Sequence, residues 1–328
     1  MYAIRTPENI FADADIYLRI YIGGFVFLFL YNVVTGIFTS LGDSKTPLYF
    51  LIASSLSNIA LDWVFVAVCH WDVAGVAWAT FICQGAACLL AMFTLRKRLE
   101  AIESDGTPEI FSFPMLKRIT WIAIPSVLQQ SFISVGNIFI QSLINGYGSS
   151  VIAGYSAAIK INTFAINCFS TLGNAVSSFT AQNIGAGEED RIRKGLRAGL
   201  RIGIMLAVPF FLVCFFKGDF LIHLFMKEES KDALHTGIEF LKIVSPFYLV
   251  VSLKLATDGL LRGSGAMKSF MTSTFTDLIL RVVLGYILAV PFETTGIWMS
   301  WPVGWVIGTM LSLLFYAKGV WKTKGMRS

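Results

Sequence analysis

Apolar segments long enough to cross a membrane recur along nearly the whole chain. A membrane-spanning helix needs about 20 consecutive, mostly apolar residues. Nine segments qualify, at roughly 16–41, 48–71, 75–95, 119–144, 152–184, 198–216, 235–261, 267–290 and 296–316. A porin-type barrel would show shorter segments of alternating polarity, and this pattern does not occur here. The pattern therefore predicts an all-α polytopic membrane protein with about nine transmembrane helices.

Two segments far apart in the sequence resemble each other, which indicates an internal repeat. Aligning Tyr17 with Phe240 gives an offset of 223 residues. The same offset pairs further residues: Gly36 with Gly259, Gly42 with Gly265, and Lys45 with Lys268. Predicted helices one to three thus match helices seven to nine, and helices four to six have no partner. We therefore expect the chain to be truncated, lacking the first three helices of its first unit.

The repeat and the polar segments together predict the domain organisation. Residues 1–95 form the C-terminal half of an N-lobe, with three helices. Residues 119–328 form a C-lobe of six helices. Residues 96–118 are the only long polar segment of the chain, and we interpret them as a cytoplasmic linker.

Composition and charge agree with a membrane protein and exclude several other classes. Only 14% of the residues are charged and 55% are hydrophobic, whereas soluble domains carry about 25% charged residues. Lysine and arginine gather in every second predicted loop, which predicts a multi-pass protein of the plasma (inner) membrane with a cytoplasmic C-terminus. This orientation explains the basic residues without nucleic acid binding. No metal-ligand spacing and no catalytic constellation occurs, so we expect neither a metal site nor an enzyme.

Amide side chains occur at membrane depth in two neighbouring predicted helices. Gln129, Gln130 and Asn137 lie in segment 119–144, and Asn162 and Asn167 lie in segment 152–184. Polar side chains are costly when they face lipid. These two helices should therefore face each other or line a wet cavity, and we favour the cavity as a substrate or cation site. Asn58 and Asp62 form a smaller polar pair, for which hydrogen bonding between helices is the preferred interpretation.

Charged side chains stand within two of the last predicted helices. Lys254, Asp258 and Arg262 are spaced i, i+4, i+8, so they share one helix face and can pair along it. Asp258 either belongs to a structural ladder of charges or forms the coupling or substrate site with Lys254, and the sequence leaves both open. Asp277 and Arg281 form a second i, i+4 pair, which we interpret as structural.

Short glycine-containing motifs end three of the predicted helices and are interpreted as architectural. Their residues are Gly42, Asp43, Lys45 and Pro47 in the first, Gln182, Asn183, Gly185 and Gly187 in the second, and Arg262, Gly263 and Gly265 in the third. In this order the motifs LGDSKTPLYF, AQNIGAG and LLRGSGAMKS resemble those of the multidrug and toxic compound extrusion (MATE) transporters.

The resemblance implies twelve helices in two six-helix lobes, joined by a cytoplasmic loop that corresponds to residues 96–118. It also implies export of hydrophobic, cationic small molecules in exchange for Na⁺ or H⁺, by alternating access and without an organic cofactor. The expected partners are a small-molecule substrate and the lipid bilayer, and the expected state is a monomer. Two features depart from the family. The missing helices would carry an acid that many members use for coupling, and amides replace a glutamate in segment 119–144.

The sequence supports one main functional hypothesis and one alternative. The main hypothesis is secondary-active efflux by cation-coupled antiport. The alternative is a flippase or exporter of a lipid-linked sugar or another amphiphile, within the same wider architecture. A noncatalytic membrane scaffold would be preferred only if the truncated chain were the native product.

Overall fold

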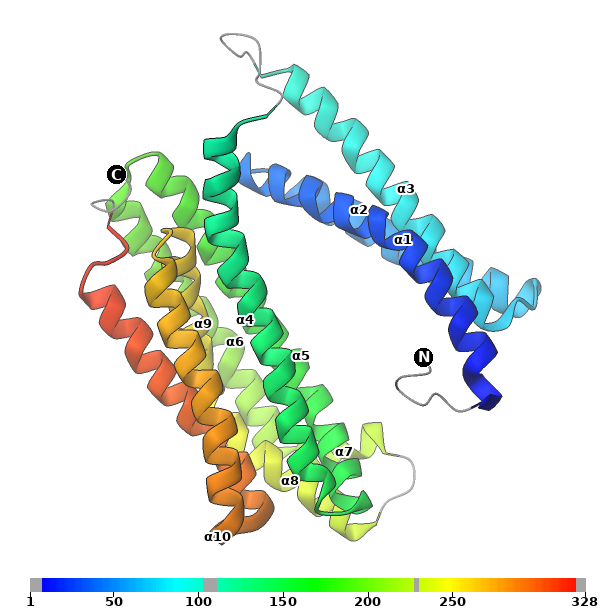
Figure 1. Cartoon of the computed structure of the whole chain (residues 1–328), viewed down its shortest axis with the longest axis vertical. Coiled ribbons are helices and arrows are strands. Elements are labelled where there is room, and N and C mark those ends of the chain that lie inside the picture. The colour runs from blue at the N-terminus through cyan, green and yellow to red at the C-terminus, as the bar shows by residue number, and fades with distance from the viewer. Residues whose placement is uncertain (1–7, 103–110, 227–229, 323–328) are drawn as a thin grey trace. The chain divides into compact units, whose positions relative to one another are not determined.

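The computed structural model describes residues 8–102, 111–226 and 230–322, and within these ranges the regular structure is helical (Figure 1). The helices are α1 (Glu8–Ser40), α2 (Lys45–Trp63), α3 (Asp72–Glu100), α4 (Phe113–Asn145), α5 (Ser149–Gly185), α6 (Glu189–Phe216), α7 (Gly218–Phe225), α8 (Lys231–Val244), α9 (Tyr248–Gly263) and α10 (Met267–Ala317). A π-helical turn, Val64–Val68, extends α2, and a 3₁₀ turn, Ser245–Phe247, joins α8 to α9. The all-α prediction is confirmed.

Most of the predicted spans have a helical counterpart whose bounds differ from the prediction by up to nine residues. Seven helical stretches are long and apolar enough to cross a membrane within the described ranges. Helix α5 carries too many polar residues to count among them. Helix α10 has 51 residues and contains two predicted spans, separated by Glu293 with φ 50°. That positive φ interrupts the helical backbone between segments 267–290 and 296–316.

The structure differs from the sequence prediction in two places. The predicted segment 235–261 is divided between α8 and α9, because Pro246 has no N–H to continue the α-helical hydrogen bonds. Helix α3 continues to Glu100 and α4 begins at Phe113, so both helices extend into the polar segment 96–118. The connection between α3 and α4 is thus shorter than the polar segment 96–118.

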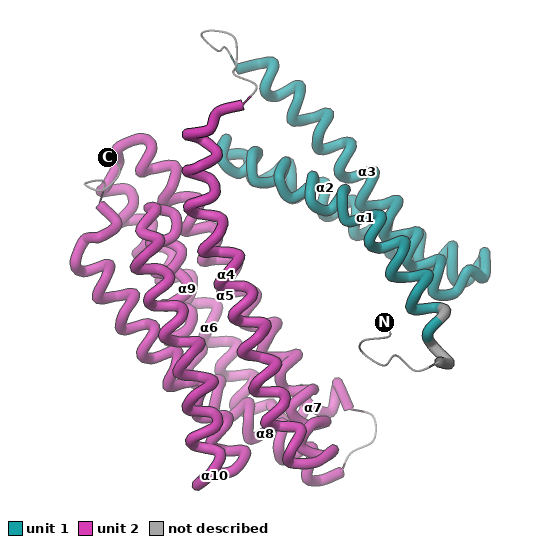
Figure 2. The backbone as a smooth tube through the Cα atoms, in the orientation of Figure 1, with its two compact units in different colours: residues 1–110 teal, residues 111–328 magenta. Residues whose placement is uncertain are grey.

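The chain divides into two compact units, residues 1–110 and 111–328 (Figure 2). The boundary falls inside the predicted linker, while the assignment of the units to transporter lobes remains a prediction. In unit 1, α3 packs against both α1 and α2. Val34, Phe38, Ala91 and Leu95 are buried there.

Unit 2 is organised around α9, which packs against α5, α6 and α10. Aromatic residues fill much of its core. The Tyr155 and Trp298 rings are stacked with centroids 5.3 Å apart, and Phe240 packs edge-on against Trp298 at 5.2 Å. Such pairs stabilise a core beyond the area that they bury. This packing joins α5 and α8 to the second half of α10.

The three glycine motifs end their helices with the same turn geometry, in which a left-handed glycine follows the last helical turn. Gly42, Gly187 and Gly265 have φ values of 82°, 75° and 75°. In each turn the glycine N–H binds the carbonyl three residues earlier, and the next N–H binds the carbonyl five residues earlier. This is the Schellman arrangement, in which glycine avoids the strain of a positive φ. Gly42 and Gly265, which the repeat aligns, therefore occupy equivalent turns.

The other motif residues lie at the same helix ends. Asp43 accepts hydrogen bonds from the Thr46 N–H (3.1 Å) and hydroxyl (2.8 Å) at the start of α2. The Thr46 backbone N–H, followed by its hydroxyl, lowers the pKa of Asp43. The Pro47 carbonyl accepts a bond from the Tyr31 hydroxyl at 3.0 Å. Gln182, Asn183 and Gly185 form the last turn of α5.

Candidate functional site

Four charged side chains are buried together on α9 and α10 in unit 2. Lys254, Asp258, Asp277 and Arg281 have 3%, 3%, 6% and 5% of their surface exposed. Burying a charge is costly unless an opposite charge or a hydrogen bond compensates it. The four residues carry two positive and two negative formal charges, so together they are neutral. Their charge balance makes the buried cluster possible.

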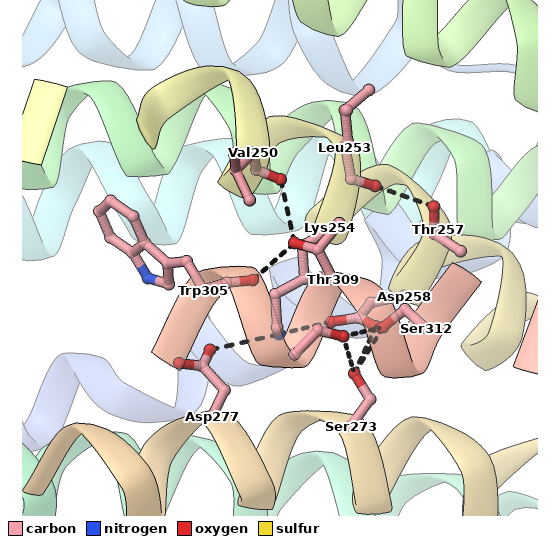
Figure 3. Close-up of polar contacts among 11 residues, drawn as sticks. Val250, Leu253, Lys254, Thr257, Asp258, Ser273, Asp277, Trp305, Thr309 and Ser312 are labelled. Atoms are coloured by element: carbon pink, nitrogen blue, oxygen red, sulfur yellow. Dashed lines mark hydrogen bonds and ion pairs between the residues drawn. The ribbon is translucent and has the colours of Figure 1, made fainter. Parts of the chain in front are cut away.

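Lys254 is the centre of the cluster. Its Nζ lies 2.7 Å from Asp258 Oδ2 and 3.4 Å from Asp277 Oδ2 (Figure 3). One ammonium group therefore bridges two carboxylates that belong to different helices. The expected pairing of Lys254 with Asp258 occurs, and the carboxylate of Asp277 is a second partner.

Arg281 does not form the i, i+4 ion pair with Asp277 that its spacing allowed. Among the described residues, the ion pair of Asp277 is with Lys254. The Arg281 guanidinium instead lies over the Trp301 ring, with Cζ 4.4 Å from the ring centroid. The i, i+4 spacing places two side chains on one helix face, but the tertiary contacts here give both residues other partners.

The second oxygen of Asp258 is hydrogen-bonded to two serines of α10. Ser312 Oγ donates to Asp258 Oδ1 at 2.5 Å, and Ser273 Oγ lies 3.2 Å from the same atom. The two hydroxyl oxygens are 2.5 Å apart, and both lie near the Gly308 carbonyl at 3.1–3.2 Å. Both carboxylate oxygens of Asp258 are therefore engaged.

Two glycines allow the second half of α10 to approach the charged residues. A Cβ added to Gly308 would lie 2.5 Å from Lys254 Cε and 3.1 Å from Asp277 Cβ. A Cβ added to Gly304 would lie 2.6 Å from Asp277 Oδ1. Both positions thus require the absence of a side chain. The ion pairs and the helix packing depend on the same two residues.

A cavity of about 510 Å³ adjoins this cluster, with walls from α4, α5, α9 and α10. Asp258, Arg281 and Trp301 line it. So do all five amides that the sequence predicted to lie at membrane depth, namely Gln129, Gln130, Asn137, Asn162 and Asn167. The cavity therefore combines amide groups, an aromatic ring and charges of both signs.

Arg262 lines the same cavity but has partners on α5 rather than Asp258. Its Nη2 donates to Asn174 Oδ1 at 2.5 Å, and its Nε donates to Ser177 Oγ at 3.4 Å. The predicted ladder of three charges along α9 thus stops at Asp258. Gly263, on the same turn, packs against the Ser177 backbone, where a Cβ would clash with the carbonyl oxygen.

Unit 1 has a smaller cavity of its own, of about 200 Å³, lined by Asn58, Gln84 and Tyr31 among others. Asn58 Nδ2 and, one turn further along α2, Asp62 Oδ1 are buried without a hydrogen-bond partner among the described residues. The hydrogen bonds between helices that the sequence suggested for this pair are thus not formed by these two atoms.

Several residues of the cluster escaped the sequence analysis. Ser273, Gly304, Gly308 and Ser312 support the charges but carry no charge themselves. The sequence does contain a pattern that marks part of this set, since small residues recur at every fourth position of one helix: Ser300, Gly304, Gly308 and Ser312. Small residues at this spacing mark close contacts between membrane helices. The stripe predicts a close approach but not the charged groups that it contacts.

A bundle of membrane-spanning helices with charged and amide side chains around an internal cavity is the arrangement of a membrane transporter. A family profile, MatE, matches residues 1–64 and 125–287. The chain belongs to this family of multidrug efflux transporters, as the motifs predicted, and it is a multi-pass membrane protein rather than an enzyme.

Individual relatives agree with this assignment. The probable multidrug resistance protein YpnP of Bacillus subtilis (strain 168) is 29% identical over 327 residues, covering 97% of this chain and 71% of the relative. Human multidrug and toxin extrusion protein 1 is 24% identical over 346 residues, covering 97% of this chain and 56% of its own length. The crystal structure of a Vibrio cholerae MATE transporter, VcmN, superimposes with a TM-score of 0.88 at 18% identity, covering 97% of this chain and 72% of that chain.

Proposed function

We propose that the protein exports hydrophobic small molecules with a positively charged group, by antiport against a coupling cation that binds at Asp258. The observation that carries this proposal is the position of Asp258, which lines the polar cavity and also pairs with Lys254. The proposal includes residues 1–95 as half of an N-lobe, residues 119–328 as the C-lobe, and a cytoplasmic C-terminus.

The exchange follows from the two partners available to Lys254. A cation that reaches Asp258 competes with the Lys254 ammonium for Oδ2. Lys254 already lies 3.4 Å from Asp277 Oδ2, so it keeps a partner when it leaves Asp258. The cargo and the coupling cation compete for one carboxylate, and this competition is the basis of antiport. Alternating access then presents the same site to the two sides of the membrane.

The oxygen atoms around Asp258 favour a proton over Na⁺ as the coupling ion. Asp258 Oδ1, the Ser273 and Ser312 hydroxyls and the Gly308 carbonyl are separated by 2.5–3.2 Å. These are hydrogen-bond separations. Ca²⁺, a cation of about the same size as Na⁺, keeps its oxygen ligands at about 2.3–2.6 Å, and in octahedral coordination at that distance neighbouring ligands lie about 3.3–3.7 Å apart, slightly farther than these atoms. The existing network therefore suits proton transfer and would have to expand for Na⁺.

The test is dye export from proteoliposomes that contain the full-length protein, with a proton or a Na⁺ gradient imposed separately. The wild-type protein should export a cationic dye when only the proton gradient is present, and Asp258→Asn should abolish this coupled export. Asp190→Asn, an exposed acid of α6, is the matched control and should transport normally. Normal coupled export by a well-expressed Asp258→Asn protein would refute the assignment, and export with Na⁺ alone would refute the proton.

A further inference from the structure

Two adjoining cavities lie at the end of unit 2 where α4 begins and α9 leads into α10 (Figure 1). The larger cavity, of about 490 Å³, is lined by the first half of α4 and the first turns of α10, and most of its residues are apolar. The smaller cavity, of about 250 Å³, is lined by the turn before α10 and by residues that follow α10. Trp121, Met267 and Lys268 line both cavities. The two therefore form one continuous depression, which we call the basic groove.

Lysine side chains line the basic groove without acidic side chains to balance them. Lys117 lines the larger cavity, Lys322 lines the smaller one, and Lys268 lines both. All three lysines are exposed. Within the ranges that the structure describes, no acidic residue lines either cavity and none of the three lysines forms an ion pair. The groove is therefore positively charged and suits an anionic ligand.

The apolar part of the groove lies along α4, which is long and apolar enough to span a membrane. Trp121 and Ile124 line it and are 60% and 54% exposed. Lys117 precedes Trp121 by one helical turn, so the two side chains share one helix face. Lysine and tryptophan near a helix end are typical of the level of the lipid headgroups. Ile124 and Pro125 continue the groove from that level toward the acyl chains.

Basic residues at one end of a membrane protein set its orientation without binding a particular lipid. Binding needs a concave surface as well, and basic pockets between membrane-spanning helices bind anionic lipid headgroups. We propose that the basic groove binds a phospholipid with an anionic headgroup. The phosphate contacts Lys268 and Lys322, and one acyl chain lies in the larger cavity beside Trp121. This inference requires a chain that spans the membrane, and it does not depend on the proposed transport function.

The experiment measures contact between lipid and Trp121 by fluorescence quenching. The purified full-length protein is placed in phosphatidylcholine nanodiscs that contain increasing mole fractions of a brominated lipid, either phosphatidylglycerol or phosphatidylcholine. Bromine quenches tryptophan on contact, and the signal of Trp121 is the difference between the wild-type protein and Trp121→Phe. Each basic residue near the membrane surface strengthens the attraction to anionic lipid about fivefold. Half-maximal quenching should therefore require at least about tenfold less brominated phosphatidylglycerol than brominated phosphatidylcholine.

Variants assign that preference to the groove. Lys268→Gln should lower it about fivefold, and the addition of Lys117→Gln should lower it further. Lys45→Gln is the matched control, because the repeat aligns Lys45 with Lys268 and both are exposed near the start of a helix. Lys45 lines neither cavity. Lys45→Gln makes the same change in net charge as Lys268→Gln and should leave the preference unchanged.

Equal quenching of Trp121 by the two brominated lipids, or no quenching by either, would overturn the proposal. An equal loss of preference in Lys45→Gln and Lys268→Gln would also overturn it, since net charge alone would then explain the preference. Excess soluble glycerol 3-phosphate should leave the preference intact because it has no acyl chain, and a loss would assign the groove to free phosphate instead of lipid. The lipid comparison and this competition need no lysine variant, so misfolding of Lys268→Gln does not affect them.

Discussion

Replacing Lys254 by methionine removes the cation that bridges two buried carboxylates. Methionine retains an unbranched chain, so the change is mainly one of charge. The Lys254 side chain is 3% exposed, and its partners Asp258 and Asp277 are 4% and 9% exposed. Breaking a buried ion pair from one side costs about 3–5 kcal/mol, because the other charge stays buried without compensation. We expect Lys254→Met to lower the free energy of unfolding by about this amount.

A second substitution should restore most of the loss. In Lys254→Met with Asp258→Asn, the remaining charges of the cluster are those of Asp277 and Arg281, which again cancel. Replacing both members of a buried pair by neutral groups is often nearly neutral for stability. We therefore expect the double variant to unfold within about 1–2 kcal/mol of the wild-type protein, and to be clearly more stable than Lys254→Met alone.

The assay is reversible denaturant-induced unfolding of the purified protein in mixed micelles, with intrinsic tryptophan fluorescence as the signal. Lys160→Met is the matched control, since Lys160 is exposed on α5, and it should change the stability by less than about 0.5 kcal/mol. Two results would refute the reasoning. Lys254→Met could prove as mild as the control, or the double variant could prove no more stable than the single one.

Three further predictions concern packing, hydrogen bonding and turn geometry, and the same unfolding assay checks them. The repeat aligns Gly36 with Gly259, yet Gly36→Ala should be neutral or stabilising by up to about 1 kcal/mol, because a Cβ there meets nothing within 4 Å. Gly259→Ala should cost about 1–3 kcal/mol, because its Cβ would clash with the α5 backbone; equal effects at the two glycines would contradict this. Ser312→Ala should cost about 1–3 kcal/mol by removing a donor to Asp258, and no measurable loss would count against that bond. Gly265→Ala should cost about 1–2 kcal/mol, since φ there is 75°, and an unchanged stability would argue against the left-handed turn.

The hydropathy pattern predicted the helical fold, because the length and apolar composition of a segment are enough to identify a membrane-spanning helix. The predicted helix bounds were less accurate where a single residue interrupts the helical backbone. Pro246 divides one predicted helix into α8 and α9, although the apolar run continues across it. The five amides were selected because polar groups at membrane depth are costly, and all five line one cavity. The cost of burying a polar side chain depends on the residue type and on its depth in the membrane, and both can be read from the sequence.

Which charged side chains pair with each other depends on tertiary geometry, and the sequence predicted these pairs only in part. The i, i+4 spacing of Asp277 and Arg281 allowed an ion pair, yet Lys254 from another helix takes the carboxylate and Trp301 covers the guanidinium. Gly304 and Gly308 allow these partners to come close because they carry no side chain, and they have no functional group that would mark them in the sequence. A contact between residues that are far apart in the sequence requires the helix packing to be known.

The most direct test of the central claim is an experimental structure of the full-length protein with a cationic rhodamine bound. We expect density for the dye in the cavity between α4, α5, α9 and α10, with its positively charged group toward Asp258. Density that lies only elsewhere, for example in the smaller cavity of unit 1 beside Asn58, would contradict the claim that this cavity is the transport site.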